Sequence, residues 1–204
     1  MADFKAHTIL GALWGVVWGI IALLTGLCSF MGSIVVLFLA TVGSAIPDID
    51  SPTGRPRELV LSFLGVMLPV VVFLNFAKDI ATENILIAVI ITFFLTRYLL
   101  EHILSLWTVH RGLWHSIPVG ILCAEIAYLL FWDADIKSRF VYTTAVLGGF
   151  LSHLILDEMY SVKILEVSAK SSFGTALKFK SRSKTQSTLL YVIIFSLGAI
   201  CFLF

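Results

Sequence analysis

The sequence has few charged residues and few cysteines, and each shortage excludes a class of protein. Only 13% of its 204 residues are charged while 59% are hydrophobic, which excludes a soluble globular domain of ordinary composition. Cys28, Cys123 and Cys201 stand singly in apolar surroundings, so they predict neither a disulfide framework nor a zinc motif. The net charge of +1 gives no case for a nucleic-acid partner. The composition predicts a polytopic membrane protein.

Long apolar runs are plentiful, and their lengths predict the architecture. A bilayer core of about 30 Å requires about 20 apolar residues per helix. We therefore predict an all-α bundle of about seven transmembrane helices that forms a single integral membrane domain over residues 1–204. The predicted spans are 8–27, 30–46, 59–77, 84–101, 117–132, 140–157 and 188–204.

The distribution of lysine and arginine predicts the orientation of these spans. If successive connections alternate sides, one face receives the amino terminus and segments 47–58, 102–116 and 158–187. Eleven lysines and arginines belong to that face, and three, namely Lys78, Lys137 and Arg139, belong to the other. By the positive-inside rule, the first face and the amino terminus are cytoplasmic.

Side chains that commonly ligate metals fall on the same face. All five histidines do so, and the aspartates that end the second and sixth spans join them. These residues are His7, His102, His110, His115, His153, Asp48, Asp50 and Asp157. Because imidazole and carboxylate groups bind divalent transition metals, we expect a metal site at the cytoplasmic end of the bundle.

Small residues recur at every fourth position in the first and sixth spans, and both series include ligand-type side chains. The series are His7, Gly11, Gly15, Gly19 and Ala145, Gly149, His153, Asp157. Small-residue stripes let helices approach closely in lipid. Since the two spans are antiparallel, packing their stripes together would bring His7 beside His153 and Asp157. The alternative for the first span is a packing groove with an incidental interfacial histidine.

Two connecting segments supply the remaining candidates. Asp48 and Asp50 follow Pro47 in what we predict to be a non-helical turn, which suits metal ligation or, alternatively, helix capping. His110 and His115 would point roughly 140° apart on one helix, so sharing an ion needs a bend between them, and Gly112 allows one. Arg111 offers bidentate hydrogen bonds to an anion. Histidines that cap the fifth helix are the alternative.

Two further features have open interpretations. Segment 158–187 is long and basic, which is typical of a loop that lies on an anionic membrane surface or, alternatively, of one that covers a site and holds an anionic head group. Glu125 lies in the middle of the fifth span, where a carboxylate must be protonated or paired. Arg97 is a plausible partner. The two residues would form either a structural ion pair or part of the polar lining of the site.

Taken together, these motifs give the chain a resemblance to a known family. It resembles the predicted membrane-bound metal-dependent hydrolases of bacterial inner membranes, and the likeness extends from residue 7 to about residue 160. The matching motifs are His7 with Gly11, Pro47-Asp48-Ile49-Asp50, His110-Arg111-Gly112 with His115-Ser116, and Ser152-His153 with Asp157. The resemblance implies a metal-dependent hydrolytic site made by His7, Asp48, Asp50, His110, His115, His153 and Asp157.

Two residues depart from the pattern of that family and bear on the shape and ligand set of the site. Trp114 stands where the family would have a small threonine, and Ser51 stands where a further histidine is common.

The resulting hypothesis is a hydrolase that acts at the cytoplasmic membrane interface on a phosphoester or similar bond of a lipid or other anionic, membrane-associated substrate. Seven donors exceed the three protein ligands of a typical catalytic zinc, so we expect one or two ions of zinc, manganese or iron. Asp50 or Asp157 would act as general base, and Arg111 would stabilise developing charge. The alternatives are a metal-ion or proton-coupled transporter, a non-catalytic scaffold or regulatory protein, and a serine mechanism through Ser116 or Ser152.

Overall fold

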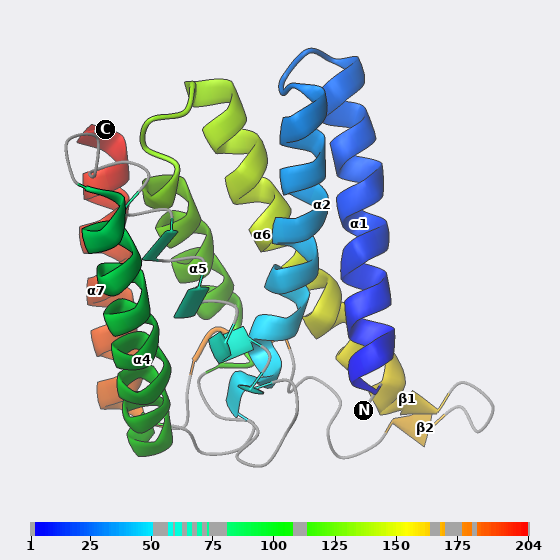
Figure 1. The fold of residues 1–204 in the computed structure, drawn as a ribbon. Coiled ribbons are helices and arrows are strands. Elements are labelled where there is room, and N and C mark those ends of the chain that lie inside the picture. Colours follow the sequence, from blue (N-terminus) through cyan, green and yellow to red (C-terminus); the bar gives the residue numbers. More distant parts are fainter. Residues whose placement is uncertain are drawn as a thin grey trace. The chain divides into compact units, whose positions relative to one another are not determined.

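In the part of the chain that it describes, the computed structural model consists of helices with their turns and one pair of short strands (Figure 1). It describes residues 3–50, 57–58, 60–62, 65–66, 69–70, 73, 81–107, 114–163, 168–169, 177–180 and 183–203. These residues belong to two compact units. The first unit comprises residues 1–48 and 111–204, and the second comprises residues 49–110.

In its described residues, the first unit contains five α-helices and the strand pair. Its helices are α1 (Phe4–Leu24), α2 (Phe30–Ala45), α5 (Ile117–Leu130), α6 (Ile136–Ser161) and α7 (Lys184–Leu203). A 3-10 helix, η1 (Ile46–Asp50), continues α2 at the boundary between the units. Strands β1 (Val162–Lys163) and β2 (Ser168–Ala169) pair antiparallel inside the segment that the sequence predicts to be only a loop.

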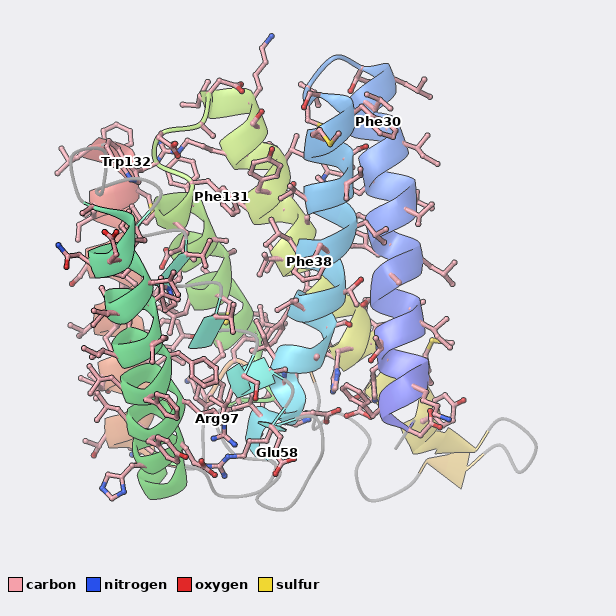
Figure 2. All side chains as sticks on the ribbon, in the orientation of Figure 1. Phe30, Phe38, Glu58, Arg97, Phe131 and Trp132 are labelled. Carbon is pink, nitrogen blue, oxygen red and sulfur yellow. The ribbon has the colours of Figure 1, made fainter. Side chains whose placement is uncertain are left out.

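Four helices in the described part of the chain are long and apolar enough to cross a membrane. They are α1, α2 with most of η1, α6 and α7, whereas α5 is apolar but shorter. Apart from their first and last turns, such helices bond every backbone amide and carbonyl within their own segment, which a hydrocarbon environment requires. Large apolar side chains are exposed along them, including Phe30 and Phe38 on α2 (Figure 2). The prediction of a helical membrane protein is confirmed.

Helices also occupy the predicted ranges, except that range 59–77 lies largely outside the described residues. The main difference concerns Pro47 and Asp48, which the sequence places in a non-helical turn. They lie instead in η1. Helix α2 ends with the Ile46 amide donating to the Val42 carbonyl, and the chain passes directly from there into the 3-10 helix. Pro47 is fully buried there.

Helices α1 and α2 form an antiparallel hairpin (Figure 1). The Asp3 side chain caps the start of α1 by accepting from the Ala6 amide, and the Ser29 side chain caps α2 by accepting from the Gly32 amide. Between the helices Gly26 adopts a φ of 69°, a left-handed conformation that glycine adopts at little cost. This turn reverses the chain and places α2 against the glycine stripe of α1.

The glycines of the two small-residue stripes pack against α2, whereas the histidines of the stripes meet each other directly. A Cβ added to Gly15 of α1 would lie 2.7 Å from the Leu37 Cα of α2. A Cβ added to Gly149 of α6 would overlap the Ala40 carbonyl oxygen of the same helix. Helix α2 therefore lies between α1 and α6 (Figure 1), and its own small residues, which the sequence analysis missed, make both approaches possible.

Apolar packing completes the first unit. One buried cluster joins α1, α2 and α6 and includes Ala22, Val36, Ala40, Val141 and Ala145. A second cluster joins α5, α6 and α7 and includes Val119, Phe150, Leu154, Leu190 and Ile194. Helix α6 belongs to both clusters, so it links the amino-terminal hairpin to the carboxyl-terminal helices.

The second unit contains α4 (Thr82–Trp107). Arg97 lies toward the carboxyl end of α4 (Figure 2). It pairs with Glu101 one turn later. The buried Arg57 donates from Nη2 to the Glu101 carbonyl at 2.9 Å. Arg97 therefore has an acidic partner on its own helix, and its predicted pairing with Glu125 is not needed to neutralise it.

Candidate metal centre

Five of the predicted ligands converge at one end of the first unit. His7 lies near the start of α1, Asp48 lies in η1, His115 directly precedes α5, and His153 and Asp157 lie one turn apart near the end of α6. Four chain segments thus contribute to one polar cluster. The His7, His115, His153 and Asp157 side chains are at most 7% exposed, and that of Asp48 is 17% exposed.

The ring nitrogens of the three histidines face the two carboxylates. His153 Nε2 lies 3.7 Å from Asp48 Oδ1 and 3.7 Å from Asp157 Oδ2. His115 Nε2 lies 4.0 Å and 3.8 Å from the same two atoms. Ligand atoms around a tetrahedral zinc are about 3.3 Å apart, given metal bonds of about 2.0–2.1 Å. Each of these four nitrogen–oxygen distances is therefore within 1 Å of that spacing.

The hydrogen bond of His153 prepares its other ring nitrogen for ligation. Nδ1 lies 2.7 Å from the Ser44 carbonyl oxygen. Because a carbonyl can only accept, Nδ1 carries the proton, and Nε2 of the neutral ring presents its lone pair to the carboxylate-lined space. Among the described residues Nε2 has no hydrogen-bond partner, although the side chain is fully buried. Metal-binding histidines are commonly oriented by such a bond to a backbone carbonyl.

The orientation of the rings separates His7 from the other two histidines. The His7 and His153 rings are stacked, with centroids 3.7 Å apart and planes inclined by 14°. A metal ion lies in the plane of an imidazole that binds it, and two nearly parallel stacked planes do not meet within bonding distance. His7 and His153 therefore cannot bind the same ion in this arrangement, although their nitrogens are close.

The His115 and His153 rings do allow a common ion. Their planes are inclined by 67° and their centroids lie 5.4 Å apart, so their lone pairs can converge. His115, His153 and Asp48 offer ligand atoms within 4.8 Å of one another, as do His7, His153 and Asp157. Since Asp157 Oδ2 is also 3.7–3.8 Å from His153 and His115, we group His115, His153, Asp48 and Asp157 as a four-residue set. His7 Nε2 instead faces the other oxygen of Asp157, Oδ1, at 3.4 Å. We call the four-residue set the primary position.

The predicted proximity of His7 to His153 and Asp157 is therefore present in the structure, but α2 makes it possible. The Ser44 carbonyl that orients His153 belongs to α2, and a Cβ added to Gly11 of α1 would overlap the Ser44 side chain. Sequence analysis missed Ser44 because a backbone carbonyl leaves no trace in residue identity. His110 and Arg111, with Gly112, lie outside the described residues, as does the side chain of Asp50.

The remaining polar candidates do not belong to the primary position. Glu125 is on α5, and a Cβ added to Gly198 of α7 would stand 3.1 Å from Glu125 Oε1. The Ser152 hydroxyl donates to the Gly149 carbonyl at 2.6 Å. Ser116, at the N-cap position of α5, is 1% exposed. The Ser152 hydroxyl is thus committed to its own helix, which argues against its use as a nucleophile.

A family model described as YdjM inner membrane protein matches residues 1–201, and the chain belongs to this family. The match confirms the predicted resemblance at the level of an inner-membrane protein family, and it agrees with the apolar helices. Comparison with curated proteins finds no match, and comparison with solved structures finds none either.

Proposed function

We propose that this inner-membrane protein is a metal-dependent hydrolase whose centre lies at the cytoplasmic end of a seven-span bundle. Its substrate would be a lipid or another anionic, membrane-associated molecule with a phosphoester or similar bond. The observation that supports this proposal is the convergence of buried imidazoles and carboxylates, with a fully buried His153 Nε2 directed at them. The excess of lysine and arginine on one face supports the orientation.

The residues of the primary position suit such chemistry. His115, His153 and Asp157 would hold one divalent ion, and Asp48, the most exposed of the set, would face the entry path as a fourth ligand or as general base. A divalent ion there would supply Lewis acidity and lower the pKa of a bound water. His7 would orient Asp157 through Oδ1. Asp50 and Arg111 keep their predicted roles as base and charge-stabilising group.

A non-catalytic structural metal is the second candidate, and the ligand count favours it. Four protein ligands can complete a tetrahedral structural site, whereas catalytic zinc sites usually keep one position for water. A transporter fits less well, because the cluster lies at one end of α1 and α6 while transport sites lie near the bilayer midplane.

The deciding experiment measures metal content and turnover on the same preparation. Full-length protein in neutral detergent would be analysed for bound metal, then assayed on phospholipid and isoprenoid phosphate substrates with and without chelator. We expect stoichiometric metal and chelator-sensitive hydrolysis, and we expect His115→Gln to lose both. The matched control is His102→Ala, which removes an exposed histidine of α4 that is outside the cluster.

The outcomes separate the candidates. Metal without turnover of any substrate would favour the structural site, and wild-type protein without metal would reject both. Metal or proton flux into liposomes that His115→Gln abolishes would favour the transporter.

A further inference from the structure

Residues Leu177–Lys180 form a short segment, which we call the strap, that is bonded to two helices beside the metal centre. The Lys178 carbonyl accepts from the Ile117 amide at 3.1 Å. The next carbonyl, that of Phe179, accepts from the Tyr191 hydroxyl at 2.9 Å. Because two successive carbonyls are held, one by α5 and one by α7, the strap has a fixed position.

The residue of α5 that holds the strap is close in sequence to a ligand of the primary position. Ile117 is the first residue of α5, and His115 precedes it by two residues. The strap bond satisfies the Ile117 amide, Pro118 has none, and the Val119 and Gly120 amides both donate to the Ser116 carbonyl. The start of α5 therefore has no free amide for an anion, and any anion recognition there falls to side chains.

The strap side chains combine positive charge with exposed apolar surface. Lys178 and Lys180 alternate with Leu177 and Phe179, whose side chains are 40% and 59% exposed. The strap is bonded to the first residue of α5 and, two turns into α7, to Tyr191, so it lies near one end of both apolar helices, close to the level of a membrane interface. Aromatic residues favour this level, and basic residues attract anionic lipids there.

Other described side chains at this end add to the positive charge. Lys5 on α1 and Lys184 at the start of α7 are both exposed. Acidic side chains offset part of this charge: Asp157 faces His7, but Asp48 is 17% exposed, Asp3 at the start of α1 is exposed, and Glu158 near the end of α6 is half-buried.

We propose that the strap binds the anionic head group of a membrane phospholipid, with Lys178 and Lys180 holding its phosphate and with Phe179 and Leu177 in the apolar layer. This deepens the proposed function by naming the substrate class as an anionic phospholipid. The lipid binding stands on the strap alone, and only the substrate role rests on the proposed function.

The test measures lipid binding in the absence of catalysis. Full-length protein in neutral detergent with chelator would be titrated with dihexanoyl phosphatidylglycerol, with dihexanoyl phosphatidylcholine and with glycerol phosphate. We expect the anionic lipid to bind most tightly and its affinity to fall with added salt. Lys178→Gln and Lys180→Gln should each weaken binding about fivefold, and the double variant about 30-fold.

Three further variants make the result specific. Lys137→Gln, at the opposite end of α6, should leave binding unchanged. Lys178→Arg with Lys180→Arg should retain binding, which distinguishes charge from folding. Tyr191→Phe keeps both lysines but removes one tether, so it should weaken binding by a smaller factor than the double lysine variant.

Equal binding of phosphatidylglycerol to wild type and to the folded double glutamine variant would overturn the proposal. Equal weakening by Lys137→Gln, or glycerol phosphate binding as tightly as the lipid, would overturn it as well. If the wild-type protein bound the lipid but hydrolysed none of the substrates, the result would count against the proposed hydrolase and leave the strap proposal standing.

Discussion

The two ends of the helix bundle in the first unit differ in whether their buried polar side chains have hydrogen-bond partners. The far end contains the α1–α2 turn, the end of α5 and the start of α6 (Figure 1), and it satisfies its polar side chains locally. The Trp18 indole donates to the Val141 carbonyl at 3.2 Å. The buried Arg139 lies over the Tyr128 ring at 3.8 Å and donates to the Tyr128 carbonyl. These contacts explain why polar residues are present there without any ligand.

At the candidate metal centre, by contrast, some buried polar atoms lack a hydrogen-bond partner among the described residues. Among the described residues, His7 Nδ1, His153 Nε2 and Asp157 Oδ1 have no hydrogen-bond partner. Elsewhere in the first unit only Glu125 Oε2 and Thr143 Oγ1 share this state within the described chain, and they are isolated atoms. An unsatisfied buried polar atom costs about 1–3 kcal/mol. Several of them in one cluster are better explained by a ligand than by a packing role.

The largest expected effect comes from replacing Asp157, which contacts both sides of the centre. Asp157→Asn keeps the shape but removes the charge that faces His7, His115 and His153. We expect metal affinity to fall more than about 100-fold, the upper range for residues that only support a ligand. Metal titration of the detergent-purified variant measures this. Unchanged metal affinity would mean that the unsatisfied polar atoms around Asp157 do not mark a metal site.

Replacement of Arg139 should affect stability and leave the metal centre intact. Arg139→Gln removes the stacking on Tyr128 and weakens the bond to its carbonyl, so we expect a loss of about 2 kcal/mol in the free energy of unfolding. Thermal unfolding in detergent, with metal content measured in parallel, checks this. Lys137→Gln, on an exposed side chain of the same turn, is the control. Loss of metal would contradict the separation of the two ends.

His7→Gln tests whether His7 orients Asp157 or binds a second ion. If it orients Asp157, the variant keeps one ion per chain and loses about tenfold in affinity, the lower range for supporting residues. The stacked His7 and His153 rings exclude a shared ion and so favour this result. A wild type with two ions and a variant with one would show instead that His7 is a ligand of a second metal.

The sequence predicted the helices and the proximity of His7, His153 and Asp157 because both depend largely on local patterns. Apolar runs define the spans, and the fourfold spacing of His153 and Asp157 places them on one face of α6 whatever the packing. Their meeting with His7 was also predicted, but with the wrong packing. The glycines of α1 and α6 each face α2, and the sequence analysis did not single out the small residues of that helix.

Two features of the site could not be read from residue types. The tautomer of His153 depends on a backbone carbonyl at Ser44, 109 positions away in the chain. The exclusion of His7 from the primary position depends on the inclination of two rings. Residue spacing predicts which groups share a helix face, but it does not fix the angles between rings on different helices.

The smallest expected effect concerns Asp135, which shows how the far end satisfies a carboxylate without a metal. Its Oδ2 accepts from the Ser138 hydroxyl at 2.6 Å, and Oδ1 accepts from the Ser138 and Lys137 amides at the start of α6. The hydrogen bonds from Ser138 hold the pKa of Asp135 below its usual range. A lowered carboxyl pKa stabilises the fold above the unfolded-state pKa, and this contribution is lost as the pH falls through the folded-state pKa.

We therefore expect Asp135→Ala to lower the melting temperature slightly at neutral pH, with the difference from wild type shrinking below about pH 4. Asp133→Ala, on an exposed carboxylate two residues earlier, should show no such pH-dependent difference. If the difference persisted at low pH, the capping charge would not be its cause.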